Sequence, residues 1–179
     1  MALTNKSMYA ILGILNISPS TGYDIKKYSD KVLSGFWNEN FGHIYPTLKR
    51  LLKEEMIEII STEKDKKVLY GITEKGKEEL KTWLIADTVQ QPVRSEFMLK
   101  LLFSSNQPVE KIIQMMKNYK EIYVENRMKY LKMQAELEQG IKEVAEERCF
   151  FLNAVLRRGI LSSEAVIQWC DETIEELEM

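Results

Sequence analysis

The first 56 residues alternate between helical patterns and turn-forming residues. Apolar side chains in residues 4–17 recur at helical spacing and predict a first helix. A turn at 18–22, which contains Pro and Gly, separates it from a second helix at 23–33. Residues 34–42 are rich in Gly and Asn and connect the second helix to a third. The pattern therefore predicts three short helices before residue 56.

The third helix, residues 42–53, has two chemically different faces. Pro46 is assigned to the first turn, where its missing N–H removes no intrahelical bond, so we expect the helix to begin near Gly42. One face is predicted to pack, and the other to meet solvent or a groove. The apolar stripe holds Ile44, Leu48, Leu51 and Leu52, and the opposite side with its flanks holds His43, Thr47, Lys49, Arg50 and Lys53.

After residue 56 the spacing of apolar residues changes from helical to alternating. Residues 57–61 and 68–72 each alternate in the way that is typical of a strand. The polar run at 63–67 lies between them and contains Lys64, Lys66 and Lys67. We therefore predict a β-hairpin with a charged tip.

The hairpin is followed by a helix and then by a linker. Thr73 is placed to cap a fourth helix. Residues 87–93 include Gln-Gln-Pro and read as a linker. The chain is thus predicted to have a first domain at 1–86 and a helical second domain at 94–179.

The second domain begins with a short helix and continues with a heptad pattern. From residue 109, positions in steps of three and four are apolar except at Asn126 and Gly140. Pro108 is placed to begin a helix, which would be about 48 Å long if it ran unbroken through residue 139. We expect two later helices, at 145–158 and 163–178 with a stop at Gly159, to pack against it. The heptad positions hold Val109, Ile112, Met116, Tyr119, Tyr123, Asn126, Tyr130, Met133, Leu137, Gly140 and Val144.

Charge is divided unevenly along the chain. The 179 residues have a net charge of -2. Residues 1–82 hold 13 Lys and Arg against 11 Asp and Glu, whereas residues 83–179 hold 12 against 16. The first half therefore has a charge of +2 and the second of -4, which indicates that the first half meets any polyanion.

Several classes of protein are disfavoured by composition. No apolar run is long enough to span a membrane and no signal-peptide pattern is present, so we expect a cytoplasmic protein without a membrane partner. Cys149 and Cys170 have no metal-ligand spacing, which predicts ordinary thiols, no metal and no cofactor. One histidine and no nucleotide-binding or hydrolase motif argue against an enzyme, as does the absence of a carboxylate at helical spacing from His43.

Three helices, a hairpin and a further helix are the elements of a winged helix-turn-helix domain, in their usual order. In that architecture the third helix enters the major groove of DNA, and the tip of the hairpin approaches the backbone or minor groove. The third helix and the hairpin tip are both basic here. Although solvated lysines alone are the commoner explanation of a basic tip, the two features together favour DNA binding.

Three motifs resemble those of the PadR family of bacterial transcriptional regulators. They are Thr21-Gly22-Tyr23-Asp24-Ile25, Gly42-His43-Ile44-Tyr45-Pro46-Thr47-Leu48-Lys49-Arg50-Leu51 and Leu69-Tyr70-Gly71-Ile72-Thr73-Glu74-Lys75-Gly76. Two later segments, Val93-Arg94-Ser95-Glu96-Phe97 and Ile167-Gln168-Trp169-Cys170-Asp171-Glu172, are similar to the longer branch, which includes phenolic-acid-responsive repressors and a virulence-gene activator. The resemblance implies a homodimer that binds operator DNA, most often as a repressor, and in some members releases it on binding a small molecule.

One residue departs from the family pattern. Glu55 stands just after the third helix, where the family usually has Gly and where a left-handed backbone suits Gly. Either Glu55 extends the helix by a residue or it adopts a strained conformation.

Docking geometry assigns roles to the basic and polar side chains. Residues near the start of a recognition helix usually meet base edges, while longer basic side chains meet phosphates. Tyr23 and Tyr45 are open to a second interpretation, as core aromatics with a hydroxyl at the surface. The predicted base contacts are His43, Thr47 and Arg50; the predicted phosphate contacts are Tyr45, Lys49, Lys53, Lys64, Lys66 and Lys67, with Tyr23 and Lys26 added from the second helix.

The helical domain is expected to form a two-fold dimer that presents two winged domains to a palindromic site. The predicted dimerisation residues are Val109, Ile112, Met116, Tyr119, Tyr123, Trp169 and Ile174. Aromatic residues near the linker either line an effector pocket between the domains or belong to the core. A rival function is that of a protein–protein adaptor, which would not need a basic third helix or a basic hairpin tip.

Overall fold

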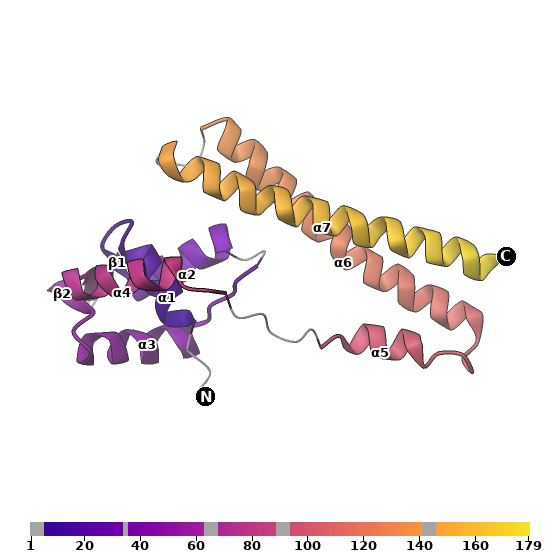
Figure 1. Cartoon of the computed structure of the whole chain (residues 1–179), viewed down its shortest axis with the longest axis horizontal. Coiled ribbons are helices and arrows are strands. Elements are labelled where there is room, and N and C mark those ends of the chain that lie inside the picture. The colour runs from indigo at the N-terminus through magenta and orange to yellow at the C-terminus, as the bar shows by residue number, and fades with distance from the viewer. Residues whose placement is uncertain (1–5, 34–35, 63–67, 89–93, 141–145) are drawn as a thin grey trace. The chain divides into compact units, whose positions relative to one another are not determined.

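The computed structural model describes residues 6–33, 36–62, 68–88, 94–140 and 146–179. Contacts divide the chain into an N-terminal unit, 1–90, and a C-terminal unit, 91–179 (Figure 1). The fold is mainly α with one small antiparallel sheet, and the predicted fold class is confirmed. Each unit is described by itself.

The N-terminal unit combines short helices with a three-stranded sheet. The strand order is β1-β3-β2, and both pairings are antiparallel. The hairpin of β2 and β3 was predicted, whereas β1 was missed because a two-residue strand is too short to show alternation. The elements are α1 (Ser7–Leu15), β1 (Ser20–Thr21), α2 (Gly22–Tyr28), the π-helical segment η1 (Ser29–Leu33), α3 (Phe41–Lys53), β2 (Ile57–Thr62), β3 (Val68–Ile72) and α4 (Glu74–Ile85).

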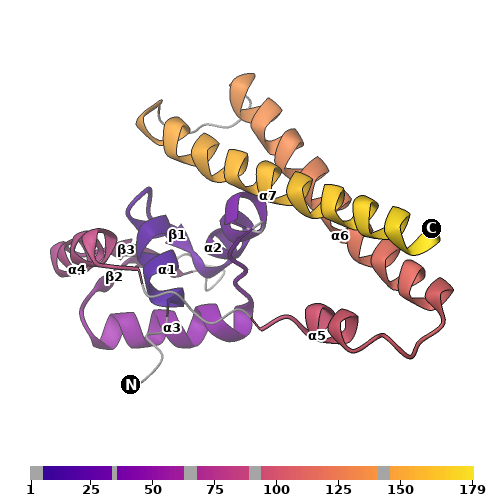
Figure 2. The same ribbon diagram turned by 45° about the vertical axis from the view of Figure 1, so that its right-hand side comes forward.

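One continuous core holds this unit together. Helix α1 is its centre and contacts α2, α3, α4 and β3; its position among them can be followed in Figure 2. Ile11, Leu12, Ile25, Ile44 and Leu51 are fully buried in this core. Because each helix buries one apolar face in the same cluster, the outer face of α3 is left for solvent.

Local signals fix the helix starts. Thr21 caps α2 in a reciprocal pair with Asp24, and Thr73 caps α4 by accepting a hydrogen bond from the Gly76 N–H at 3.2 Å, as the sequence predicts for Thr73. Helix α3 begins at Phe41 with Asn40 as its cap. The placement of Pro46 in the first turn was wrong: it lies inside the helix, where it removes one intrahelical N–H bond.

The end of α3 is a left-handed turn. Glu55 has φ of 58°, so the strained alternative holds and the helix stops at Lys53. The Met56 N–H donates to the Leu51 carbonyl at 2.9 Å, and the Glu55 N–H donates to the Leu52 carbonyl at 3.1 Å. These two bonds form a Schellman motif, which usually carries Gly where this chain has Glu55.

The turn after α3 is also tied to the start of α4. Thr73 donates through its hydroxyl to the Glu55 carbonyl at 2.8 Å and through its N–H to the Met56 carbonyl at 3.1 Å. A Cβ on Gly76 would lie 2.1 Å from the Met56 carbonyl oxygen, so the two segments touch through their backbones. The turn after α3 is therefore packed directly against the start of α4.

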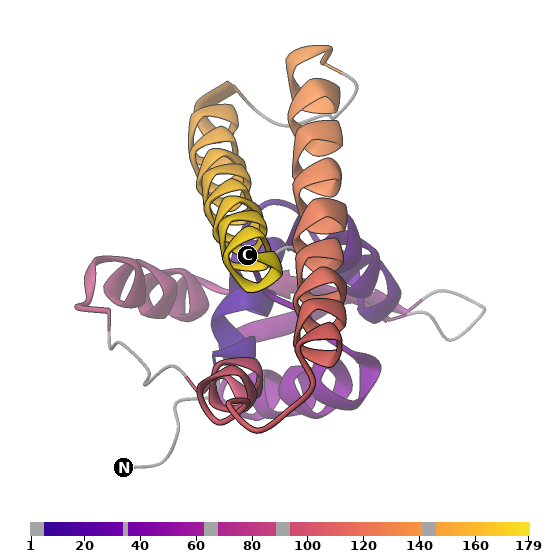
Figure 3. The same cartoon turned by 90° about the vertical axis from the view of Figure 1, so that its right-hand side faces the viewer.

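The C-terminal unit is a long helical hairpin with a short helix beside it. It contains α5 (Glu96–Leu102), α6 (Val109–Glu138) and α7 (Glu146–Glu178). Figure 3 shows α6 and α7 side by side. They are antiparallel, since Met116 early in α6 packs near Cys170 late in α7, and Tyr130 packs near Leu156. The predicted heptad seam thus faces a helix of the same chain.

The prediction of two final helices was wrong. Gly159 does not stop a helix but lies inside α7, where an added Cβ would come within 2.7 Å of the Tyr130 ring. Ser163 does not cap a new helix either; its hydroxyl donates to the Gly159 carbonyl within α7. Gly159 therefore serves the close approach of an aromatic side chain from α6 rather than a turn.

Candidate DNA-binding surface

The outer face of α3 is polar and basic, as predicted, except at one residue. His43, Tyr45, Lys49 and Lys53 are exposed. Thr47 was wrongly assigned to this face: it is only 3% exposed. It lies three residues after Ile44 and four before Leu51, so helical spacing places it on the buried stripe despite its hydroxyl group.

The first turn of α3 presents His43 to solvent. Asn40 accepts a hydrogen bond from the His43 N–H at 3.1 Å. The Nδ1 atom of His43 lies 3.9 Å from Oε2 of Glu39, four residues earlier. The expectation that no carboxylate lies at helical spacing from His43 was therefore wrong, and Glu39 escaped notice because it precedes the helix.

The basic residues further along α3 differ in their ion-pair partners. Arg50 pairs through Nε with Glu54 at 3.1 Å and contacts Met8 Sδ through Nη2 at 2.9 Å, so it lies against α1 and its own helix. Lys49 and Lys53 have no ion-pair partner among the described residues. The two lysines are thus free to meet an anion, whereas Arg50 must first leave Glu54.

Helix α2 adds aromatic and basic side chains near this face. Tyr23 is 65% exposed and Tyr45 is 52% exposed, which favours the surface interpretation of both over the core interpretation. The Tyr45 ring lies so close to Gly22 that a Cβ there would come within 2.8 Å of it. Lys26 is paired with Asp30 of the following segment η1.

Tyr70 of β3 lies behind these residues. Burial, with a smaller contribution from Tyr45, raises the pKa of the Tyr70 phenol, so it stays neutral at physiological pH. The predicted wing contacts Lys64, Lys66 and Lys67 lie outside the described residues. Strands β2 and β3 flank that segment.

The predicted dimerisation residues lie mostly inside one chain. Met116 and Ile174 are buried between α6 and α7, with Tyr119 and Trp169 packed against them. The Phe97 ring of α5 stacks on Tyr119 with centroids 3.6 Å apart. Burial, then the hydrogen bond to Tyr123, raises the pKa of Tyr119 to about 12. These residues form the core of the unit, while Val109 is exposed.

Exposed apolar side chains stand next to one another on α5 and on α7. On α5 and just after it, Met98, Leu99, Leu102 and Phe103 are exposed, the last at 75%. On α7, Phe150 and Phe151 are exposed and contact each other edge to face. We call the first group the α5 patch and the second the α7 patch. Apolar spacing shows that these helices carry apolar residues, but it does not show which of them stay exposed on one chain.

The described part of the chain lacks two other kinds of feature. It holds no group of His, Cys, Asp and Glu that is arranged to bind a metal ion. None of its helices is both long enough and apolar enough to cross a membrane.

Two family comparisons cover most of the chain. Residues 11–82 match the transcriptional regulator PadR-like family, and residues 93–178 match the family described as virulence activator alpha C-term. The negative transcriptional regulator PadR of Bacillus subtilis (strain 168) is 42% identical over 101 residues, which are 54% of this chain and 56% of that protein. The match thus spans little more than half of that relative's length.

Solved structures are similar over the full length. Bacillus subtilis PadR in complex with operator DNA has a TM-score of 0.80 and 27% identity, covering 96% of this chain and 98% of that one. Bacillus subtilis PadR in complex with p-coumaric acid has a TM-score of 0.81 and 25% identity, covering 100% and 99%. The chain therefore belongs to the PadR-like family of transcriptional regulators, with a winged-helix domain followed by the helical domain of the virulence-activator type.

Proposed function

We propose that this regulator is a homodimer that binds operator DNA in a sequence-specific manner and represses transcription. The observation that carries the proposal is the outer face of α3, where His43, Tyr45, Lys49 and Lys53 are exposed while the opposite face is locked in the core. A helix held in this way can enter a major groove without unfolding anything. The similar PadR structure with operator DNA supports this use.

The contacts divide by position on α3. His43, in the first turn, is the base-contact candidate, and Arg50 becomes one once it leaves Glu54. Lys49 and Lys53 are suited to phosphates, as are Tyr23, Tyr45 and Lys26 at the edge of the face. Lys64, Lys66 and Lys67 remain proposed wing contacts. Thr47 is not proposed again because it is buried.

A second copy of the chain is the proposed occupant of the α5 and α7 patches. Apolar residues exposed to this degree in neighbouring positions mark an interaction surface. In a two-fold dimer the patches of each copy would be buried by the other copy. The same symmetry would place two α3 helices on one palindromic site. Met116, Tyr119, Trp169 and Ile174 then support the dimer indirectly, by holding α5, α6 and α7 together.

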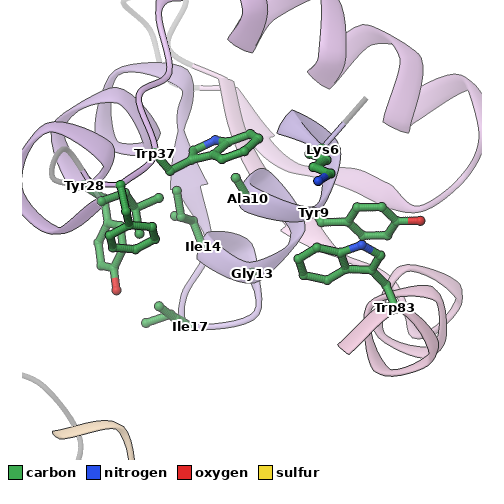
Figure 4. A pocket seen from close by; sticks show the side chains of 11 residues that line it. Lys6, Tyr9, Ala10, Gly13, Ile14, Ile17, Tyr28, Trp37 and Trp83 are labelled. Atoms are coloured by element: carbon green, nitrogen blue, oxygen red, sulfur yellow. The ribbon is translucent and has the colours of Figure 1, made fainter. Parts of the chain in front are cut away.

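A small aromatic molecule is the proposed effector, and the N-terminal unit offers a pocket for it. The pocket has a volume of about 300 Å³ and lies between α1, η1 and α4 (Figure 4). Tyr9 and Trp83 stack with centroids 4.4 Å apart at one end of it. The remaining lining residues are Lys6, Ala10, Gly13, Ile14, Ile17, Tyr28, Leu33, Phe36 and Trp37.

The lining indicates the chemistry of the effector. Aromatic rings favour a planar apolar body, and Lys6 is the one charged residue among the described lining residues, which favours an anionic substituent. An aromatic acid combines both features. The PadR structure with p-coumaric acid supports this class. The pocket lies within one unit, whereas the sequence offered a pocket between the domains only as an alternative to a core role for the aromatic residues near the linker.

Gly13 provides a direct test of the pocket. A Cβ at Gly13 meets no atom within 4 Å, so Gly13→Leu should fill the pocket without a clash in the helix. Thermal shift with p-coumaric acid should raise the melting temperature of the wild type and of Gly13→Ala, but not of Gly13→Leu. Equal shifts in all three proteins would place the ligand elsewhere, and flat curves in all would remove the support for an aromatic-acid effector.

The experiment that tests the main proposal is fluorescence polarisation with DNA from upstream of the protein's own gene. Binding should be tighter than to scrambled DNA of equal length, and should weaken as salt rises because phosphate contacts release counterions. Arg50→Ala should reduce the preference for the operator. A folded protein that binds neither DNA at low salt would instead be a protein–protein adaptor.

A further inference from the structure

The carboxylate of Glu39 is the one buried side-chain group without a full set of partners among the described residues. Glu39 is 1% exposed. Its Oε1 accepts a hydrogen bond from the Trp37 indole N–H at 2.6 Å, but no described residue donates to Oε2 within hydrogen-bond distance. A buried carboxylate oxygen without a donor is costly, so a nearby donor is expected to turn toward it.

The His43 ring is the nearest such donor. Its Nδ1 lies 3.9 Å from the open Oε2, at the i, i+4 spacing that brings side chains together. Because the His43 side chain is exposed, a small rotation about its side-chain bonds closes this gap to ordinary hydrogen-bond length. The backbone N–H of His43 is already fixed by the Asn40 cap, so only the ring needs to move.

A hydrogen bond at Nδ1 decides the chemistry of the other ring nitrogen. In a neutral imidazole one nitrogen carries the proton and the other accepts, and the partner of the first sets the role of the second. If Glu39 accepts from Nδ1–H, then Nε2 is left as an acceptor. In the major groove, an acceptor pairs with the amino group of adenine or cytosine and not with the acceptors of guanine.

We propose that Glu39 is a positioning residue that holds the proton of His43 on Nδ1, so that Nε2 selects adenine or cytosine in each half-site. The proposal rests on the proposed DNA-binding function. Glu39 touches no base itself and acts through His43 alone. Trp37 and the Ser29 hydroxyl, which accepts from the Glu39 N–H at 3.3 Å, hold Glu39 in place.

The tautomer can be measured without DNA. The chain has one histidine, so ¹⁵N-edited NMR of its ring is free of overlap. At alkaline pH, where histidine is neutral, the wild type should carry the proton on Nδ1. Glu39→Gln keeps the shape but offers an amide donor to Nδ1, and should move the proton to Nε2. A wild-type proton on Nε2, or the same tautomer in both proteins, overturns the proposal.

Two further variants keep this test decisive. Glu78→Gln removes an exposed carboxylate that pairs with Lys81 on α4, and should leave the tautomer on Nδ1. Melting curves report whether Glu39→Gln is folded. If Glu39→Gln is not folded, Glu39→Asp replaces it, because Asp keeps the charge but is shorter by one methylene and cannot reach Nδ1. The proton should then also move to Nε2. A proton that stays on Nδ1 in this variant contradicts the proposal.

The consequence for DNA is read by selection from a random-sequence library. Wild-type protein should enrich adenine or cytosine by about tenfold over guanine at one position of each half-site, and Glu39→Gln should lose that enrichment there while keeping the rest of the site. An identical selected site for both proteins overturns the proposal. Failure of the wild type to select any site contradicts the proposed function instead, while the NMR result still decides the tautomer.

Discussion

The two units of this regulator bury their apolar residues in different ways. In the N-terminal unit, helices α1 to α4 and the sheet close around one cluster that contains Ile11, Ile44 and Leu51. In the C-terminal unit, a helical hairpin forms two separate small clusters, around Met116 and around Tyr130, and leaves the α5 and α7 patches exposed. Two helices can bury only one stripe of each other, so apolar surface is left over, and this is the surface that the proposed dimer would cover.

The difference is related to function. A unit with its own core can hold α3 rigidly, and a rigid α3 is what base contact requires. A unit with exposed apolar patches is suited to association, because a second copy, as proposed, would bury them. The comparison therefore predicts that damage to one unit changes folding and that damage to the other changes assembly.

The largest expected effect comes from the core of the N-terminal unit. Leu48→Ala should lower its stability by about 2–5 kcal/mol through lost burial and a cavity. Differential scanning calorimetry should show one transition moved and the other unchanged, since Leu48 is buried in the core of the N-terminal unit. Leu156→Ala is the matched change in the C-terminal unit and should move the other transition. If both transitions move together, the units do not fold separately.

The next effect concerns assembly. Leu102→Asp with Phe103→Asp places two charges on the α5 patch, where both side chains are exposed, so the monomer should remain folded. Sedimentation should show a monomer, and operator affinity should fall by about a hundredfold because two linked half-sites become one. Lys117→Asp with Asn118→Asp, on exposed positions of α6, is the control and should remain dimeric. If the patch variant stays dimeric, the dimer interface does not include the α5 patch.

A smaller effect is expected at the end of α3. Glu55→Gly should stabilise the N-terminal unit by about 0.5–1 kcal/mol, because Gly adopts a positive φ without the strain of a side chain. The loss of the exposed Lys75–Glu55 pair, 3.8 Å apart, offsets little of this gain. Glu54→Gly, one residue earlier at φ of -84°, should give no gain. Equal melting temperatures for wild type and Glu55→Gly would argue against strain.

The smallest effect is a dependence on alkaline pH. The pKa of Tyr119 is raised to about 12 by burial and by Tyr123, above the ordinary value of about 10. A phenol whose pKa is raised on folding stabilises the protein fully below the unfolded pKa, and that contribution is lost as pH rises through the folded value. Denaturant titrations should show the C-terminal unit weakening between about pH 10 and 12, and less so in Tyr119→Phe. Parallel pH curves for the two proteins would contradict this.

Apolar spacing predicted the parts of the fold that are governed by local rules. The α3 stripe, the β2–β3 hairpin, the Thr73 cap and the long α6 each follow from periodicity or from a capping side chain. The errors at Thr47 and Pro46 came from weighing residue chemistry above position. Spacing alone places Thr47 with Ile44 and Leu51.

Other features depend on contacts between distant segments, which periodicity does not report. Gly159 resembles a helix stop until Tyr130 is known to lie against it. From the sequence, Glu39 looks like an exposed loop residue, because its burial and its contacts with Trp37 and His43 appear only in the structure. In the site, spacing found the exposed residues of α3, but it could not show that Arg50 is paired with Glu54 or that Met116 and Tyr119 are internal to one chain.

The most direct test of the central claim compares two pairs of lysines in the same unit. Lys49→Ala with Lys53→Ala removes the unpaired cations of α3, and Lys77→Ala with Lys81→Ala removes the same charge from α4, where both lysines are ion-paired. In polarisation titrations at several salt concentrations, the α3 variant should bind operator and scrambled DNA more weakly, with a salt slope reduced by about 1 per lost phosphate contact, while the α4 variant matches the wild type. Equal losses in both variants, or none in either, would contradict the assignment of α3 as the DNA-binding helix.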